Sequence, residues 1–264
     1  MTVDGSAVSS TINITGNKKK NYIIAGANGS TLNGDKGNDT LVGGAGADLF
    51  IYENKTGKDV IEGFSAGDSI SLDSSVTIKD AKTKRGNTVL KFKGGALTVN
   101  NSTEFKLGDT LYSSGVFVAG DTAKVYGSFN GEIDLANYGV NNFDGSAGKK
   151  KLTITGTDSA NSLIGGKGKD SLIGGAGNDT LWGGEGANTF RYSKGDGKDV
   201  IFGFDDDDFL EISDTFKPTY NVDKEKIALK VGSGSVTFRE FSATNFNING
   251  ETWQLTNGVF SKKE

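Results

Sequence analysis

The sequence of 264 residues contains no cysteine and no histidine. The chain therefore has no disulfide, no thiol nucleophile and no histidine-dependent catalytic triad, and it lacks the usual ligands of zinc and haem sites. A metal ion could be held only by oxygen atoms, which suits calcium. We accordingly predict no catalytic residue in this chain and no enzyme activity. The absence of cysteine also fits an extracellular protein that relies on metal instead of disulfides.

Long apolar runs are missing as well. No run approaches the roughly 18–20 residues of a membrane-spanning helix, and residues 1–10 lack the charged and then apolar pattern of a signal peptide. The net charge is −4 and the basic clusters are short, at residues 18–20, 82–85 and 149–151. We interpret these clusters as solvated turns and edge-strand protection, and predict no membrane span and no nucleic-acid partner.

Proline occurs once, whereas glycine occurs 40 times. Glycine at this level with a strict period indicates a repeat fold. The period is nine: residues 43–51 read Gly-Gly-Ala-Gly-Ala-Asp-Leu-Phe-Ile, and residues 174–182 read Gly-Gly-Ala-Gly-Asn-Asp-Thr-Leu-Trp. Both segments lie in longer arrays of nine-residue units. After each array a slip of two residues precedes two weaker units, at residues 54–71 and 194–211.

Two positions of the unit are kept throughout both arrays. The sixth position is polar and most often acidic, and the eighth position is always a large apolar residue. The sixth positions are Asn21, Ser30, Asp39, Asp48, Asp59 and Asp68 in the first array, and Asn161, Asp170, Asp179, Asn188, Asp199 and Asp208 in the second. The eighth positions are Ile23, Leu32, Leu41, Phe50, Ile61 and Ile70, and then Leu163, Leu172, Leu181, Phe190, Ile201 and Leu210.

The spacing predicts a coil. Six residues rich in glycine, asparagine and aspartate can make a tight turn, because these residues tolerate positive φ. The three remaining residues form a strand whose central side chain alone points inward. Two units then complete one coil, and units n and n+2 stack one strand spacing apart, about 4.7–4.9 Å. Calcium binds oxygen at about 2.3–2.6 Å, so one ion can reach two stacked turns.

The nonapeptide Gly-Gly-x-Gly-x-Asp-x-U-x, where U is large and apolar, resembles the calcium-binding repeat of the RTX, or hemolysin-type, family. The resemblance implies an all-β fold of two parallel β-rolls, and we expect an antiparallel β capping region after each. It also implies Ca²⁺ as the bound ion, and a secreted bacterial protein that leaves the cell by a type I system. Such a chain stays unfolded in the calcium-poor cytosol and folds outside, at the cell surface or beyond.

Pairing units n and n+2 predicts three sites with two carboxylates each: Asp39 with Asp59, Asp48 with Asp68, and Asp179 with Asp199. Pairs with one carboxylate, such as Asn188 with Asp208, should bind calcium more weakly or not at all, and the two-residue slip makes the geometry of the later units less secure. The resemblance adds backbone ligands from turn glycines. The predicted metal ligands are Asp39, Asp48, Asp59, Asp68, Asp170, Asp179, Asn188, Asp199, Asp208, Gly37, Gly44, Gly46, Gly168, Gly175, Gly177 and Gly186.

The two halves of the chain are an internal duplication. Residues 57–61, Gly-Lys-Asp-Val-Ile, recur as residues 197–201. Each half ends in alternating strands that predict antiparallel pairing, including a hairpin around Gly94-Gly95 in the first half. We predict a first roll with its cap at residues 1–120, a linking segment at residues 121–143, and a second roll with its cap at residues 144–264. The aromatic residues of the tails should form the core of the caps.

Two functions remain open from the sequence. The missing catalytic groups and the duplicated modules favour a non-catalytic structural or adhesin-like part of a longer secreted protein. The alternative is an accessory domain of a secreted protease, lipase or polysaccharide-modifying enzyme whose active site lies outside these residues. The carboxylates of residues 205–208 are more typical of a solvated or calcium-binding loop than of a glycosidase pair. Besides calcium ions, an extracellular glycan or protein remains open as a partner.

Overall fold

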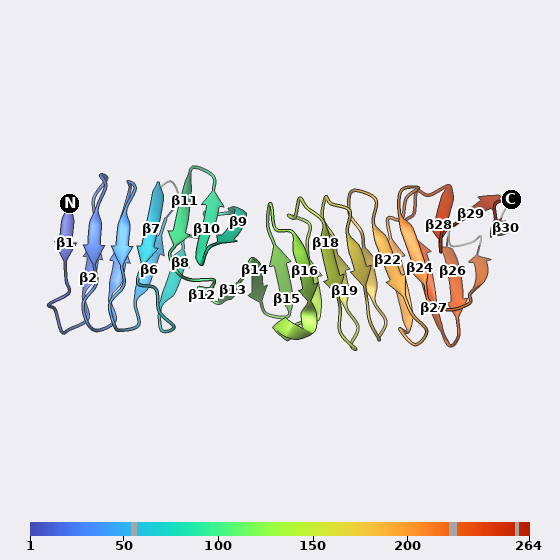
Figure 1. Ribbon diagram of the computed structural model, residues 1–264, viewed down its shortest axis with the longest axis horizontal. Coiled ribbons are helices and arrows are strands. Elements are labelled where there is room, and N and C mark those ends of the chain that lie inside the picture. Colours follow the sequence, from blue (N-terminus) through green and yellow to red (C-terminus); the bar gives the residue numbers. More distant parts are fainter. Residues whose placement is uncertain (54–56, 222–225, 257–258) are drawn as a thin grey trace. The chain divides into compact units, whose positions relative to one another are not determined.

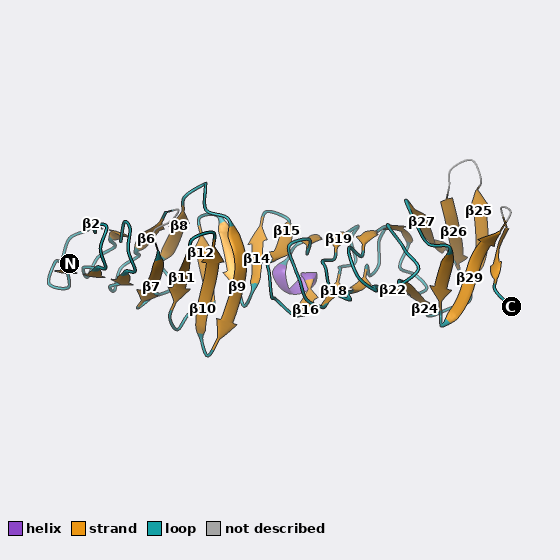
Figure 2. Cartoon of the chain, turned by 90° about the horizontal axis from the view of Figure 1, so that it is seen from above, coloured by secondary structure: helices purple, strands orange, loops and turns teal. Residues whose placement is uncertain are grey.

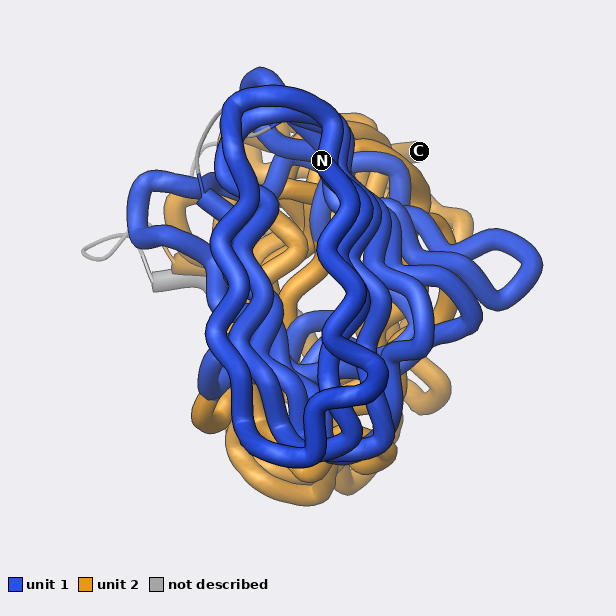
Figure 3. Tube along the Cα trace, turned by 90° about the vertical axis from the view of Figure 1, so that its left-hand side faces the viewer, with its two compact units in different colours: residues 1–119, 126–129 blue, residues 120–125, 130–264 orange. Residues whose placement is uncertain are grey.

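The computed structural model describes residues 1–53, 57–221, 226–256 and 259–264 (Figure 1). These residues form short β-strands joined by loops, with one 3-10 helix, η1 (Leu135–Tyr138) (Figure 2). The chain divides into two compact units, residues 1–119 with 126–129 and residues 120–125 with 130–264 (Figure 3). In the described part of the chain, no helix is long and apolar enough to cross a membrane.

The first unit begins with a roll of parallel strands that alternate between two sheets. Register confirms that two nonapeptides make one coil, because Ile23 lies beside Leu41 and Leu41 beside Ile61, while Leu32 lies beside Phe50. One sheet contains β1 (Thr2–Asp4), β3 (Tyr22–Ile24), β5 (Thr40–Val42) and β7 (Lys58–Glu62), and the other contains β2 (Asn13–Thr15), β4 (Thr31–Asn33), β6 (Leu49–Tyr52) and β8 (Ser69–Leu72).

The core of this roll is a single file of side chains between the two sheets. Each eighth-position residue of the first array is almost fully buried, from Ile23 to Ile70. Their neighbours in the three-residue strands face outward and are partly exposed, as the burial pattern of β4 and β5 shows. The predicted alternation is therefore confirmed.

Antiparallel strands follow the last coil of the first unit. β11 pairs in parallel with β7, and β12 with β8, so each sheet of the roll continues into the tail. The turn between β10 and β11 is Lys93-Gly94, one residue earlier than predicted, because Gly95 already pairs with Phe92. The tail strands are β9 (Ile78–Lys84), β10 (Asn87–Phe92), β11 (Gly95–Val99), β12 (Glu104–Leu107), β13 (Thr110–Ser113) and β14 (Val116–Ala119).

The second unit repeats this plan. Residues 121–143, expected to lead into the second module, form the first strands of its two sheets: β15 pairs in parallel with β17, and β16 with β18. The roll strands are β15 (Thr122–Val125), β16 (Gly131–Asp134), β17 (Asn142–Asp144), β18 (Leu152–Thr155), β19 (Ser162–Ile164), β20 (Ser171–Ile173), β21 (Thr180–Trp182), β22 (Thr189–Tyr192), β23 (Lys198–Phe202) and β24 (Phe209–Ile212).

The tail of the second unit also continues both sheets. β27 pairs in parallel with β23 and β28 with β24, and the remaining strands add antiparallel neighbours. Phe204, Phe238 and Phe246 are fully buried there and pack against one another, with ring centroids 4.8–5.6 Å apart. The tail strands are β25 (Lys217–Asn221), β26 (Lys226–Val231), β27 (Gly234–Arg239), β28 (Asn245–Ile248), β29 (Glu251–Thr256) and β30 (Val259–Lys262).

Candidate metal sites in the repeat turns

The polar side chains at the sixth position of each nonapeptide lie inside the rolls, directly before a strand or, at Asp59 and Asp199, as the second residue of one. All are buried, with at most 5% of the residue surface exposed. Carboxylates are rarely buried this deeply unless they are paired or bind a metal. The sequence pattern therefore places its charges where they need a partner. The buried residues are Asn21, Ser30, Asp39, Asp48, Asp59, Asp68, Asn161, Asp170, Asp179, Asn188, Asp199 and Asp208.

One oxygen of each carboxylate binds the backbone of the preceding coil. In the first array, the N–H of Asn21 donates to Asp39 Oδ1 at 2.7 Å, and the N–H of Asp39 donates to Asp59 Oδ1 at 2.9 Å. In the second array, Asn161 and Asp179 donate in the same way to Asp179 and Asp199. The structure thus brings together residues of units n and n+2.

The two-residue slip leaves this contact intact. Partners before the slip are 18 residues apart, as for Asn161 and Asp179, whereas Asp179 and Asp199 are 20 apart. The donor–acceptor distances are nevertheless 2.8 Å and 3.2 Å. In the second array the additional residues lie in the loop before β23, where the N–H of Ser193 donates to Asp196 Oδ2 at 2.6 Å. The register of the last coil is therefore the same as that of the others.

The turns differ in the hydrogen bonding of the second carboxylate oxygen, Oδ2. In one kind it accepts an N–H from its own turn: Asp48 Oδ2 from Gly44 at 2.7 Å, and Asp170 Oδ2 from Gly166 at 2.6 Å. In the other kind, at Asp39 and Asp179, Oδ2 is buried and has no hydrogen-bond partner among the described residues. These two residues occupy equivalent units of the two arrays, and each leaves one carboxylate oxygen available to a cation.

The asparagines at sixth positions behave differently, because their amide is itself a donor. Asn188 Nδ2 donates to the carbonyl of Gly186 at 2.9 Å, and Asn161 Nδ2 donates to the carbonyl of Asn141 at 2.9 Å. An amide proton in these turns thus contacts a carbonyl oxygen that a cation would otherwise bind. Gly186 is one of the predicted backbone ligands, and its carbonyl is already a hydrogen-bond acceptor in this structure.

The predicted glycine ligands lie in turns that stack closely on the turn one coil earlier. A Cβ atom at Gly177 would lie 2.8 Å from the carbonyl oxygen of Ser159, and one at Gly37 would lie 2.7 Å from that of Lys19. Both glycines have positive φ, 124° and 138°. Close stacking therefore requires glycine here independently of any metal. The glycines predicted at Gly44, Gly46, Gly168, Gly175 and Gly186 are packed in the same way against the backbone of the preceding turn.

Burial without a counter-charge shifts the pKa of the second-array carboxylates upward. Desolvation raises the pKa of Asp179 to about 6 and that of Asp208 to about 6. Desolvation, with repulsion from Asp179 and Asp196, raises the pKa of Asp199 to about 8. The pKa of Asp170 is raised for the same first reason. A nearby cation would reverse these shifts, since it favours the ionised form.

Asp196 was not among the predicted ligands. Its charge contributes to the raised pKa of both Asp179 and Asp199, so it lies within electrostatic reach of that pair. It is the third residue of the weaker unit that begins at Lys194, whereas the predicted ligands are sixth-position residues and turn glycines. The only signal in the sequence is the Gly195-Asp196-Gly197 triplet, which resembles the turn half of a repeat unit.

The donor chemistry of the turns fits a hard cation. Within the described residues, no three or more histidine, cysteine, aspartate or glutamate side chains form a metal-binding group. An ion would therefore need backbone carbonyls beside one or two carboxylates, and oxygen ligands of this mixed kind are those of Ca²⁺. The residues at Asp39 and Asp179 fit this requirement, because a buried carboxylate oxygen without a partner lies next to glycine-rich turns.

Comparison with protein families gives a match over both arrays. The model of the RTX calcium-binding nonapeptide repeat matches in four copies, at residues 15–51, 155–190 and 195–211. These segments match the RTX calcium-binding nonapeptide repeat. The match includes the sixth positions from Asn21 to Asp48 in the first array, but not Asp59 and Asp68, and it includes all of the sixth positions in the second.

We also compared the chain with curated proteins and with solved structures. No curated protein matches the chain. Among solved structures, the extracellular lipase LipA from Serratia marcescens is similar to 89% of this chain at 20% identity, with a TM-score of 0.26. The chain spans 38% of the length of that lipase. At this TM-score the likeness carries no functional argument.

Proposed function

We propose that this chain is a non-catalytic structural module whose two RTX rolls fold on binding Ca²⁺ outside the cell. One observation carries the proposal: Asp39 and Asp179, at equivalent places in the two arrays, each bury a carboxylate oxygen that has no hydrogen-bond partner among the described residues. Burying a charge without a partner costs several kcal/mol in effective terms. A cation at these turns would offset that cost, which couples its binding to folding.

The residues that would hold the ion follow from the stacking of the coils. In the second array these are Asp179 and Asp199, with Asp196 as an additional charge, and carbonyl oxygens of the glycine turns such as Gly177. In the first array they are Asp39 and Asp59 with the turn of Gly37. Bound calcium would supply positive charge between carboxylates that otherwise repel each other. The amide-containing turns, such as that of Asn188, would depend less on the metal, because the amide already donates to Gly186.

Calcium concentration would then decide where the chain folds. A site whose dissociation constant lies tenfold below the ambient calcium contributes about 1.4 kcal/mol to folding, and one hundredfold below contributes about 2.7 kcal/mol. Several such sites together are comparable to the stability of a whole domain, roughly 5–15 kcal/mol. A chain of this kind would remain unfolded in the calcium-poor cytosol, pass through a type I export system, and fold after secretion. The repeats of the RTX family support this location.

Titration of the full chain tests the proposal. After treatment with a chelator, Ca²⁺ should produce heat in calorimetry and an increase of β-structure in circular dichroism, whereas Mg²⁺ should do so weakly, because it needs near-octahedral geometry and releases its water reluctantly. The double variant Asp39→Asn, Asp179→Asn should bind fewer ions. Asp158→Asn, an exposed aspartate in a turn of the second array, is the matched control and should bind calcium as the unmodified chain does. Absence of heat and an unchanged spectrum would contradict the proposal.

A further inference from the structure

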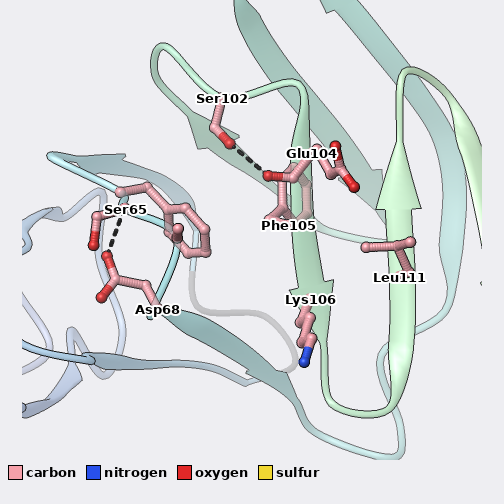
Figure 4. Close-up of a pocket in the computed structure, with 9 residues that line it drawn as sticks. Ser65, Asp68, Ser102, Glu104, Phe105, Lys106 and Leu111 are labelled. Carbon is pink, nitrogen blue, oxygen red and sulfur yellow. Dashed lines mark hydrogen bonds between the residues drawn. The ribbon is translucent and has the colours of Figure 1, made fainter.

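A pocket lies in the first unit where the last coil of the roll meets the hairpin of β12 and β13 (Figure 4). Its volume is about 390 Å³. The apolar part of the lining consists of Phe64, Phe105 and Leu111, and the polar part includes Ser65, Glu104 and Lys106. Phe64 and Phe105 contact each other edge to face, with centroids 5.9 Å apart.

The internal duplication shows what fills this space in the second unit. Strand register aligns Val99 with Phe238, because they lie beside Ile61 and Ile201, the eighth-position residues of equivalent coils. It likewise aligns Leu107 with Ile248, which places Phe105 opposite Phe246 in the alignment. The connection between the aligned strands is therefore two residues longer in the second unit.

The additional residues are Phe241 and Ser242. The residue before them, Glu240, and its counterpart Asn101 have nearly the same positive φ, 50° and 54°, so the two connections begin alike. The ring of Phe241 then packs edge to face on Phe246, with centroids 5.3 Å apart. Phe246 is the counterpart of Phe105, which lines the pocket of the first unit. Phe241 therefore occupies the region of the second unit that corresponds to the pocket.

Backbone hydrogen bonds fix the connection that contains Phe241. The N–H groups of Ser242 and Ala243 both donate to the carbonyl of Phe204, at 3.0 Å and 3.2 Å. The carboxylate of Asp206 accepts the N–H groups of Thr244 and Asn245 at 2.6 Å and 2.8 Å, which fixes the end of the connection.

The first unit has none of these contacts. Ala66 stands at the place of Asp206, and the carbonyl of Phe64, the counterpart of Phe204, accepts no hydrogen bond from the residues that the structure describes. The first unit thus has the counterparts of Phe204 and Phe246, including the carbonyl acceptor. It lacks the phenyl ring that packs on Phe246 and the N–H groups that donate to the carbonyl of Phe204.

We propose that the pocket of the first unit binds an aromatic side chain of a polypeptide partner, in the place that Phe241 fills in the second unit. The partner's ring packs edge to face on Phe105 and Phe64, an arrangement that contributes about 0.5–1.5 kcal/mol beyond burial of its area. The partner's backbone N–H donates to the carbonyl of Phe64, as Ser242 does to Phe204. Glu104 and Lys106 at the rim contact the polar groups that flank the ring. Asp68, one of the predicted metal ligands, is also in the lining of the pocket, so the site is tested with calcium bound.

The test uses N-acetylphenylalanine amide as the probe on the full, calcium-loaded chain, observed by NMR of side chains in the first unit. Binding should be saturable, shift the methyl signals of Leu111, and be at least tenfold tighter than binding of N-acetylleucine amide or toluene. The leucine compound lacks the ring, and toluene lacks the N–H donors. Equal binding of toluene would overturn the assignment of a polypeptide, and equal binding of the leucine compound would overturn the assignment of a ring.

Two variants decide whether the pocket is the site. Insertion of phenylalanine and serine between Asn101 and Ser102, combined with Ala66→Asp, copies the second unit and should weaken probe binding at least tenfold. Phe241→Ala should open the space for a ring in the second unit, so that the probe then also shifts the signals of Phe246, although the carbonyl of Phe204 keeps its donors Ser242 and Ala243. Circular dichroism verifies that each variant is folded. If the insertion variant does not fold, the Phe241→Ala result decides alone, and no shift at Phe246 would overturn the proposal.

Discussion

Replacing Asp179 by asparagine should raise stability in the absence of calcium and reduce the gain in stability that calcium gives. Oδ1 of Asp179 accepts the N–H of Asn161 at 2.8 Å, and an asparagine keeps that acceptor. Oδ2 is buried and has no partner among the described residues. In the variant an NH₂ group takes its place, and the Nδ2 atom of Asn188 shows that such a group reaches the turn carbonyl two residues earlier.

The magnitudes follow from these contacts. Without calcium, the variant no longer buries an unsatisfied polar atom, which is worth about 1–3 kcal/mol. With calcium present at ten to one hundred times the dissociation constant, the unmodified chain gains about 1.4–2.7 kcal/mol from this site, and the variant does not. A change of 1 kcal/mol shifts the melting temperature of a domain of this size by about 2–8 °C. Asp179→Asn should therefore melt higher than the unmodified chain in chelator, and its stability should gain less on adding calcium, by about 1.4–2.7 kcal/mol.

Scanning calorimetry of the full chain in both conditions measures the two shifts. Asn188→Asp is the matched control, because it makes the opposite change in the next unit of the same array. It should lower stability in chelator, since it removes the bond to Gly186, and should enlarge the gain on adding calcium. If Asp179→Asn keeps the full calcium-dependent gain of the unmodified chain, or is less stable in chelator, the reasoning from the unpartnered oxygen is refuted.

Three further outcomes are expected. In chelator, the second unit should become more stable as the pH falls from about 8 towards 4. The pKa of Asp199 is about 8 and those of Asp179 and Asp208 are about 6 in the folded state, so these residues take up protons on folding before the unfolded chain does at 3.8. Urea unfolding at a series of pH values measures this, and stability that rises with pH would contradict it. Gly177→Ala should destabilise the protein by about 1–3 kcal/mol more than Gly195→Ala does. Both glycines have positive φ, but only a Cβ atom at Gly177 would meet backbone, at 2.8 Å from Ser159. Equal losses of stability in urea unfolding would show that the stacking of the turns does not require glycine at this position. The rings of Trp182 and Phe202 stack on neighbouring strands, with their centroids 4.7 Å apart. A double-mutant cycle to alanine should therefore give a coupling energy of about 0.5–1.5 kcal/mol. A coupling energy near zero would indicate that the rings only cover the sheet.

The rolls could be predicted from the sequence because one local rule repeats. A large apolar residue at every eighth position and glycine, asparagine or aspartate in the turn leave one compact solution, in which Ile23, Leu41 and Ile61 lie beside one another. The signal does not depend on contacts between distant, unrelated segments. The fold class and the burial of the eighth positions were therefore confirmed.

Other strands could not be predicted, because pairing partners determine them. β9 has mostly polar residues and only one buried side chain, Ala81, so it lacks the alternation of a half-buried strand. β25 contains Pro218, which argues against a strand except at a sheet edge, and β25 is such an edge. β15 and β16 have no nonapeptide pattern and form because β17 and β18 are already there to pair with.

Part of the candidate metal site also could not be predicted from the sequence. Spacing predicted that Asp39 and Asp59, or Asp179 and Asp199, would come together, and their backbone-to-carboxylate hydrogen bonds show that they do. The sequence did not indicate that one oxygen of each carboxylate binds the preceding coil, which leaves only the other for a metal. Asp196 was missed because it is the third residue of its unit and not the sixth, and only the folded loop relates it to Asp179 and Asp199.

The hydrogen bonds from each coil to the carboxylate of the next also determine how the roll responds to force. A pull on the N-terminal end loads these contacts in sequence, because the coil that contains Asn161 is held by Asp179, and that of Asp179 by Asp199. Coils should detach one after another, each releasing 18 to 20 residues and extending the chain by about 60–70 Å. Under tension in an atomic force microscope the protein should therefore lengthen in regular steps. Added calcium should raise the force of the steps that separate a calcium-binding pair such as Asp179 and Asp199, without altering their length.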